Sequence, residues 1–278
     1  MVSDTLKTIV FMLILASPSV FADDFELRTL NNEMVELRSH GDFGKALELA
    51  KQSLAMAEEI YQGDHIAVAQ ALNNLAVIYK DMGRYEEAVP LYRRSLVMRE
   101  TLLGLNDPSV ATVLNNLAVV YARMGNYEDA ILYADRAVDI LKFSRGTSRD
   151  IALATSNLAE IYKQQHRYDD AEKHYTESLN MMVDLRGKTH TDVAISLSNL
   201  AQLYLVQGRL KEAEPLFLES IAIFKKTLGA NHSRVRRLYL TMSRLYEKLG
   251  ELEKSEEYLG YVDKWLQTTG NQTNQENR

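Results

Sequence analysis

Asparagine side chains recur along this 278-residue chain at a nearly constant spacing. An Asn amide carries two N–H donors and an acceptor oxygen, so a regular row of amides can pair with the main chain of an extended peptide. Such a row would hold a peptide without reading its side chains, and the residues around it would supply specificity. The members of this Asn row, each 41 or 42 positions from the next, are Asn32, Asn74, Asn116, Asn157 and Asn199.

A second group of polar side chains lies near the C-terminal end. Its members, at positions i, i+4, i+7 and i+11, are Arg237, Thr241, Arg244 and Lys248. This spacing places all four on one face of a helix. Guanidinium groups pair well with carboxylates and phosphates, so this face is predicted to hold an acidic stretch or the C-terminal carboxylate of a partner. The alternative is a solvated basic face that binds nothing.

The Asn row also has a structural alternative. An amide on a packed helix needs a hydrogen-bond partner, and the adjacent helix can supply it. A second, mostly polar column directly precedes the row, with the members Asn31, Asn73, Asn115, Ser156, Ser198 and Leu240. The residues alone leave open whether the row contacts a ligand or only neighbouring helices.

The elements that must position these side chains form an internal repeat. Tyrosine returns at Tyr79, Tyr121, Tyr162, Tyr204 and Tyr246. Around each tyrosine, apolar residues at i, i+3, i+4 and i+7 predict an amphipathic helix, and a second helix follows. Stacked copies of such a unit bury a continuous core between neighbours. The expected copies span about 26–63, 66–104, 108–146, 149–187, 191–229 and 233–267.

The repeat block is LNNLAVIYKDMGRYEEA at 72–88 and LNNLAVVYARMGNYEDA at 114–130. Its small-residue position, its glycine between the helices and its tyrosine spacing resemble the tetratricopeptide repeat (TPR). The 42-residue period and the Gly-x-x-His or Asp linker are similar to the kinesin-light-chain subclass. The block departs from the pattern at Leu37, which replaces Tyr, and at His166, which replaces Gly.

The resemblance covers residues 28 to about 266. It implies an all-α fold, a right-handed superhelical solenoid of about six helix-turn-helix repeats. It also implies that the first helix of each repeat lines a concave surface, where family members hold peptide ligands.

The N-terminal 22 residues have the parts of a secretory signal peptide. Lys7 precedes the apolar run Ile9 to Leu15, and the small-residue site Val20-Phe21-Ala22 predicts cleavage after Ala22. A membrane anchor is the alternative, but a spanning helix needs about 20 apolar residues. We therefore expect export to a bacterial periplasm, with no integral membrane segment after signal removal. Secretion and N-terminal anchoring are the alternatives.

The other end of the repeat region, 23–267, carries a cap. Asp263 occupies a position that is apolar in the earlier copies, and terminal repeats need a polar outer face. Trp265 and Leu266 are expected to seal this end against the preceding helix. The segment 268–278 lacks apolar residues, which predicts a disordered tail.

Several function classes are disfavoured by composition. The chain has no cysteine, which excludes disulfides, thiolate metal sites and cysteine nucleophiles. The net charge of −6 argues against a nucleic-acid binder. Phosphate-binding loops and hydrolase motifs are absent from the sequence. Three histidines, His65, His190 and His232, fall in equivalent linkers, so we interpret them as structural residues that cap a helix or hydrogen-bond there, rather than as metal ligands.

The sequence thus predicts no enzyme and no cofactor. It predicts a scaffold or adaptor that binds a protein or peptide, of unknown identity, in the concave groove. The basic C-terminal end would suit acidic or carboxylate-bearing segments. The alternative is a self-associating structural component of an envelope assembly without a peptide ligand, so homo-oligomer formation stays open.

Overall fold

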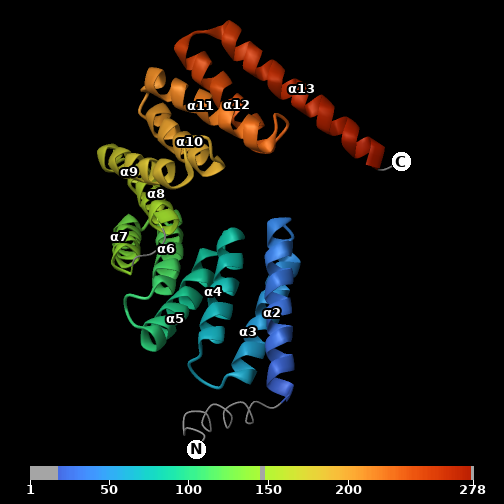
Figure 1. Cartoon of the computed structure of the whole chain (residues 1–278), viewed down its shortest axis with the longest axis vertical. Coiled ribbons are helices and arrows are strands. Elements are labelled where there is room, and N and C mark those ends of the chain that lie inside the picture. Colours follow the sequence, from blue (N-terminus) through green and yellow to red (C-terminus); the bar gives the residue numbers. More distant parts are fainter. Residues whose placement is uncertain (1–17, 145–147, 277–278) are drawn as a thin grey trace, which may run out of the picture. The chain divides into compact units, whose positions relative to one another are not determined.

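The computed structural model describes residues 18–144 and 148–276, and these are almost entirely helical (Figure 1). Twelve helices of this described part follow one another as six helix-turn-helix pairs. The prediction of an all-α fold with about six repeats is therefore confirmed. The helices fall into two compact units, which divide the chain between residues 144 and 145.

The N-terminal unit contains three pairs. In each pair the first helix packs along the second, and the second also packs on the first helix of the next pair. The helices are α2 (Pro18–Ser39), α3 (Phe43–Ile60), α4 (Ile66–Asp81), α5 (Tyr85–Leu103), α6 (Pro108–Arg123) and α7 (Tyr127–Phe143).

The C-terminal unit repeats the arrangement with three further pairs. Its helices are α8 (Ser148–Gln164), α9 (Tyr168–Arg186), α10 (Thr191–Val206), α11 (Leu210–Leu228), α12 (Ser233–Leu249) and α13 (Leu252–Glu276).

Serine at the small-residue position of a second helix makes a bond that recurs in both units. The side-chain Oγ donates to a backbone carbonyl in the first helix of the same pair, over 2.7 Å in each case. These bonds join Ser95 to Ala69, Ser178 to Ala152 and Ser220 to Ala194. A small side chain here lets the helices approach closely, and the hydroxyl still finds a buried partner.

Histidine caps begin three of the first helices. The Nδ1 atoms of His65, His190 and His232 accept the backbone N–H two residues later, over 3.1 to 3.2 Å. Asp107 caps α6 in the same way, with Pro108 in the first turn. Each cap satisfies one of the N–H groups that a helix start leaves unpaired. The interpretation of these histidines as structural caps is confirmed.

His166 follows α8 with φ of 61°, the left-handed region that favours glycine. The equivalent Gly208, after α10, has φ of 76°. Five copies therefore use glycine to end the first helix, and one copy accepts a strained residue.

Relief of this strain is testable. We expect His166→Gly to raise the free energy of unfolding by about 1 kcal/mol, because the left-handed conformation costs a side-chain-bearing residue more than the added chain entropy of glycine. Chemical denaturation measures the change. The matched control, Gly208→Ala, should lower stability by a similar amount. A loss of stability in His166→Gly would contradict this account.

The two ends of the repeat region differ from their sequence predictions in detail. The helix α2 begins at Pro18, inside the predicted signal peptide 1–22, whose first 17 residues lie outside the described residues. The last helix, α13, continues to Glu276, so helical backbone extends into the segment 268–278 that we expected to be disordered. That segment has no apolar side chain to pack, and its disorder stays a prediction.

The expected seal of the last pair forms only in part. The Trp265 ring stacks on the Arg236 guanidinium, 4.6 Å from its centroid, and Trp265 Nε1 donates to the Asn231 carbonyl over 2.5 Å. Leu266 stays 51% exposed, because it lies about 100° around α13 from Trp265 and does not share the face that makes these contacts.

Within the described ranges, no helix has both the length and the apolar character needed to cross a membrane.

Candidate ligand-binding site

The Asn row of the N-terminal unit links neighbouring first helices. Asn74 on α4 donates from Nδ2 to Asn31 Oδ1 on α2 over 2.9 Å. Asn116 on α6 makes the equivalent bond to Asn73 Oδ1 over a longer 3.4 Å. Each bond joins the row to the polar column of the preceding pair. Asn32 lies exposed on α2, which no pair precedes in this unit.

The C-terminal unit repeats this pattern once. Asn199 on α10 donates from Nδ2 to Ser156 Oγ on α8 over 3.3 Å, and Asn157 lies half-buried on α8. One N–H of each amide of Asn74, Asn116 and Asn199 is therefore engaged by a neighbouring helix. Any ligand contact by these residues must use the remaining polar atoms.

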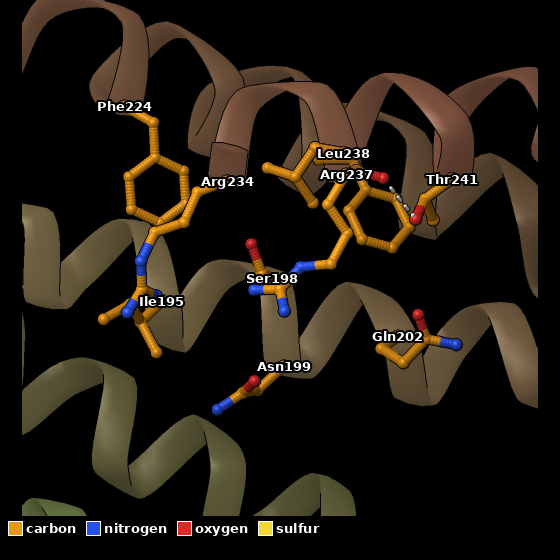
Figure 2. A pocket seen from close by; sticks show the side chains of 10 residues that line it. Ile195, Ser198, Asn199, Gln202, Phe224, Arg234, Arg237, Leu238 and Thr241 are labelled. Atoms are coloured by element: carbon orange, nitrogen blue, oxygen red, sulfur yellow. Dashed lines mark hydrogen bonds between the residues drawn. The ribbon is translucent and has the colours of Figure 1, made fainter. Parts of the chain in front are cut away.

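A pocket of about 270 Å³ opens between α10 and α12 and brings together three of the predicted site residues. These are Asn199, Arg237 and Thr241 (Figure 2). One face of α10 and one face of α12 line the pocket. On each helix the lining residues are spaced i, i+3, i+4 and i+7, starting at Ile195 on α10 and at Arg234 on α12. We call it the groove pocket, and its full lining is Ile195, Ser198, Asn199, Gln202, Phe217, Phe224, Arg234, Arg237, Leu238 and Thr241.

The groove pocket combines an apolar part with a polar rim. Phe217 and Phe224 of α11 are almost fully buried and belong to the core of this unit. Figure 2 shows the side chains of Arg234 and Arg237 extending from α12 toward α10. Arg234 also lies over the Phe224 ring, 5.8 Å from its centroid. A ligand here would meet apolar surface and positive charge together.

The arginines of α12 lack acidic partners. Within the described residues, Arg234, Arg236, Arg237 and Arg244 form no ion pair. Every other arginine of this unit with a described side chain has a carboxylate within 4 Å: Arg149, Arg167, Arg186 and Arg209. Among the arginines of this unit with described side chains, those without a carboxylate partner therefore all lie on α12, in a chain whose net charge is −6.

Some polar atoms of the rim are already engaged. Ser198 Oγ lies 2.7 Å from Ser220 Oγ, and Thr241 Oγ1 donates to the Arg237 carbonyl over 3.1 Å. The side chains of Gln202 and Arg237 make no hydrogen bond with a described residue. The free groups are therefore one amide and the guanidinium groups, which together can bind a carboxylate.

Two residues of the predicted basic face on α12 do not join the groove pocket. Arg244 and Lys248 lie exposed on α12, beyond the turns that line it. Helical periodicity places them on the face of Arg237, but the pocket residues of α10 meet only the first half of α12. Their role in binding stays a prediction.

Sequence reasoning missed a link between the repeated tyrosines and acidic residues. Tyr204 donates to Glu172 Oε1 over 2.8 Å, and Tyr246 donates to Glu214 Oε1 over 2.6 Å. Burial, aided by Glu172, raises the pKa of Tyr204 to about 12, so the phenol stays protonated and acts as a donor. These bonds join neighbouring pairs, which makes the tyrosines scaffold residues.

Comparison with known proteins supports this architecture. The family model described as tetratricopeptide repeat matches residues 34–101, 67–142, 150–226 and 192–260. No curated protein sequence matches the chain significantly.

Solved structures share the fold at low sequence identity. BtubC (BKLC) from P. vanneervenii is 22% identical, with a TM-score of 0.69 over 82% of this chain and 92% of that chain. A Podosopora anserina protein described as a kinesin light chain with nearly identical TPR-like repeats is also 22% identical, with a TM-score of 0.63 over 73% of this chain and 96% of that one. A Rap protein complexed with Competence and Sporulation Factor is 13% identical, with a TM-score of 0.63 over 89% and 76%.

Proposed function

Because the chain belongs to the tetratricopeptide repeat family, we propose that it is a non-catalytic scaffold that binds a segment of a partner protein. The groove pocket is the observation that carries the proposal. It is concave, it is partly apolar, and it carries a few convergent polar groups, which are the features of ligand sites. The Rap protein complexed with Competence and Sporulation Factor is a ligand-bound example of this fold.

The bound segment is proposed to present a carboxylate next to an apolar side chain. Arg234 and Arg237 supply positive charge without an internal acidic partner. The rings of Phe217 and Phe224 form the apolar part beside them. An acidic side chain or a C-terminal carboxylate satisfies the arginines, since both offer the paired oxygens that guanidinium groups bind.

Charge reversal tests this assignment. We expect Arg237→Glu to weaken partner binding by tenfold or more, because it places like charge against the carboxylate. A pull-down from the exported fraction identifies the partner, and calorimetry with the purified partner measures Kd. The matched control is Lys211→Glu, a charge reversal at an exposed residue of α11 outside the groove pocket. Equal affinities for the two variants would contradict the proposal.

Self-association is the second candidate, and one observation favours it. Leu252, Leu259 and Leu266 lie seven residues apart on α13 and are 63%, 40% and 51% exposed. The equivalent side chains Phe217 and Phe224 of α11 are buried. An exposed apolar stripe of this kind suits another helix. Light scattering at micromolar concentration tests self-association, and a monomeric protein at that concentration would exclude it.

The proposed place of action is the periplasm after export. This proposal rests on the apolar run and small-residue site within 1–22. Mass spectrometry of the mature protein tests it, since a chain that begins at Asp23 supports cleavage and an intact Met1 contradicts it.

A further inference from the structure

A second hollow, distinct from the groove pocket, lies on the N-terminal half of α12. It has a volume of about 390 Å³, and we call it the arginine pocket. Its lining is Ser233, Arg234, Arg236, Arg237 and Leu240. Arg234 and Arg237 also line the groove pocket, whereas Arg236 and Ser233 line only this one.

Arg236 is held in a fixed position at this hollow. Its guanidinium stacks on Trp265 of α13, 4.6 Å from the ring centroid. Its Nε is buried and has no hydrogen-bond partner among the described residues. A buried donor without a partner costs stability, so the packing of Arg236 at this position is not explained by its own hydrogen bonds. The equivalent residue in the preceding pair is the fully buried Ala194, which shows that arginine is not required here for packing.

Three guanidinium groups share the first turns of α12 without a carboxylate to balance them. Like charges at this separation repel, and the N-terminal end of the helix dipole adds further positive potential. A bound anion offsets both effects. The arrangement therefore favours a ligand with a high negative charge on few atoms.

The number of donors indicates which anion fits. A carboxylate has one charge and two oxygens, whereas a phosphate monoester carries about −1.5 to −2 and three acceptor oxygens. Three guanidinium groups and the Ser233 hydroxyl match the larger set. A membrane surface of anionic lipids is disfavoured as the ligand. The neighbouring helix α13 exposes Glu253, Glu256 and Asp263 beside α12, and these carboxylates would repel such a surface. We propose that the arginine pocket binds the phosphoryl group of a soluble phosphate monoester.

The chain contains a built-in reporter for this site. Trp265 is its single tryptophan, and it contacts Arg236 directly. Inorganic phosphate is titrated into the full chain at pH 8 and constant ionic strength, where phosphate is a dianion. We expect a saturable change in tryptophan fluorescence. Acetate at the same ionic strength should bind at least about tenfold more weakly, since it offers fewer charges and acceptors.

Variants separate the arginine pocket from the groove pocket. Arg236→Gln should weaken phosphate binding about tenfold or more, while Lys211→Gln, at an exposed position of α11 outside both pockets, should leave it unchanged. Arg236→Gln also removes the stacking partner of Trp265, so calorimetry serves as a second readout. Thr241→Val alters only the groove pocket and should leave phosphate binding intact. Failure of the groove proposal is therefore distinguishable from failure of this one.

Three results would overturn the phosphate site. The first is no saturable signal up to about 10 mM phosphate. The second is equal binding of acetate and phosphate, or equal affinity in wild type and Arg236→Gln. The third is tighter binding to phosphatidylcholine vesicles containing phosphatidylglycerol than to phosphate, which would assign the site to a lipid surface.

Discussion

Phe217→Ala is expected to lower the unfolding free energy of the C-terminal unit by about 3–5 kcal/mol. The Phe217 ring is 1% exposed and packs in the core cluster that α10, α11 and α12 share. Truncation removes the transfer energy of the ring and leaves a cavity that the stacked helices can fill only in part. The loss is large because the ring is buried in a cluster to which both neighbours of α11 in this unit contribute side chains.

Urea denaturation followed by Trp265 fluorescence measures this loss, since the single tryptophan lies in the same unit. The control is Leu218→Ala, the next residue on α11, which is 40% exposed. It should cost less than about 1 kcal/mol, because its side chain buries little area. Phe217 also lines the groove pocket, so partner affinity should fall in the first variant only. Similar stability losses for the two variants would contradict the assignment of Phe217 to the core.

The repeat architecture was predictable because each of its signals has a local cause. The tyrosine spacing sets the period, and the apolar residues at helical spacing define the face that packs. His166 is the one departure from glycine at the first-helix ends, and the backbone there still adopts the left-handed conformation. Local turn geometry is thus imposed by the stack even where the residue type is unfavourable.

The candidate site was predictable only in part, because it depends on how neighbouring pairs meet. Periodicity assigns Arg237 and Arg244 to one face, but it does not say how far along α12 the pocket residues of α10 reach. It also does not show that Asn74 bonds back to Asn31 of the preceding pair. Helix crossing decides these contacts, and one sequence does not specify it.

The tyrosine links carry a signal that was present in the sequence. Glu172 and Glu214 each follow the small alanine of a second helix and stand 32 residues before Tyr204 and Tyr246. On α5, two pairs before the pair that contains Glu172, the residue at the same position is Val89, whose side chain cannot accept a hydrogen bond. A search for acids at constant separation from the tyrosines would have found these links.

Acid sensitivity of the C-terminal unit is the second expected effect, and Glu160 contributes to it. Burial alone would raise the pKa of Glu160, but hydrogen bonds from Lys163 and Tyr175, each of 2.6 Å, hold it below its usual value. A hydrogen bond from Arg209 likewise lowers the pKa of Glu172. A carboxyl with a lowered pKa in the folded state stabilises above its unfolded pKa, about 4.3 for Glu. This contribution is lost as the pH falls through the folded value.

We therefore expect the unfolding free energy of this unit to fall below about pH 4. Glu160→Gln should lower stability at pH 7 by up to about 1 kcal/mol, since it removes the charge that Lys163 and the buried Tyr175 hydroxyl both contact, while the 40% exposure of the Glu160 side chain lets solvent screen that charge. Urea unfolding at several pH values measures both the loss of unfolding free energy at pH 7 and the slope of the unfolding free energy against pH.

The slope is the decisive part of this experiment. Glu160→Gln should show a flatter decline between about pH 5 and pH 2, because glutamine takes up no proton in that range. Glu219→Gln on α11 is the control, since Glu219 is exposed and forms no ion pair within the described residues. It should retain the decline of the wild type. A Glu160→Gln variant with an unchanged slope would show that the acid sensitivity comes from other carboxylates, and the contacts of Glu160 would then stabilise the folded chain equally in both protonation states.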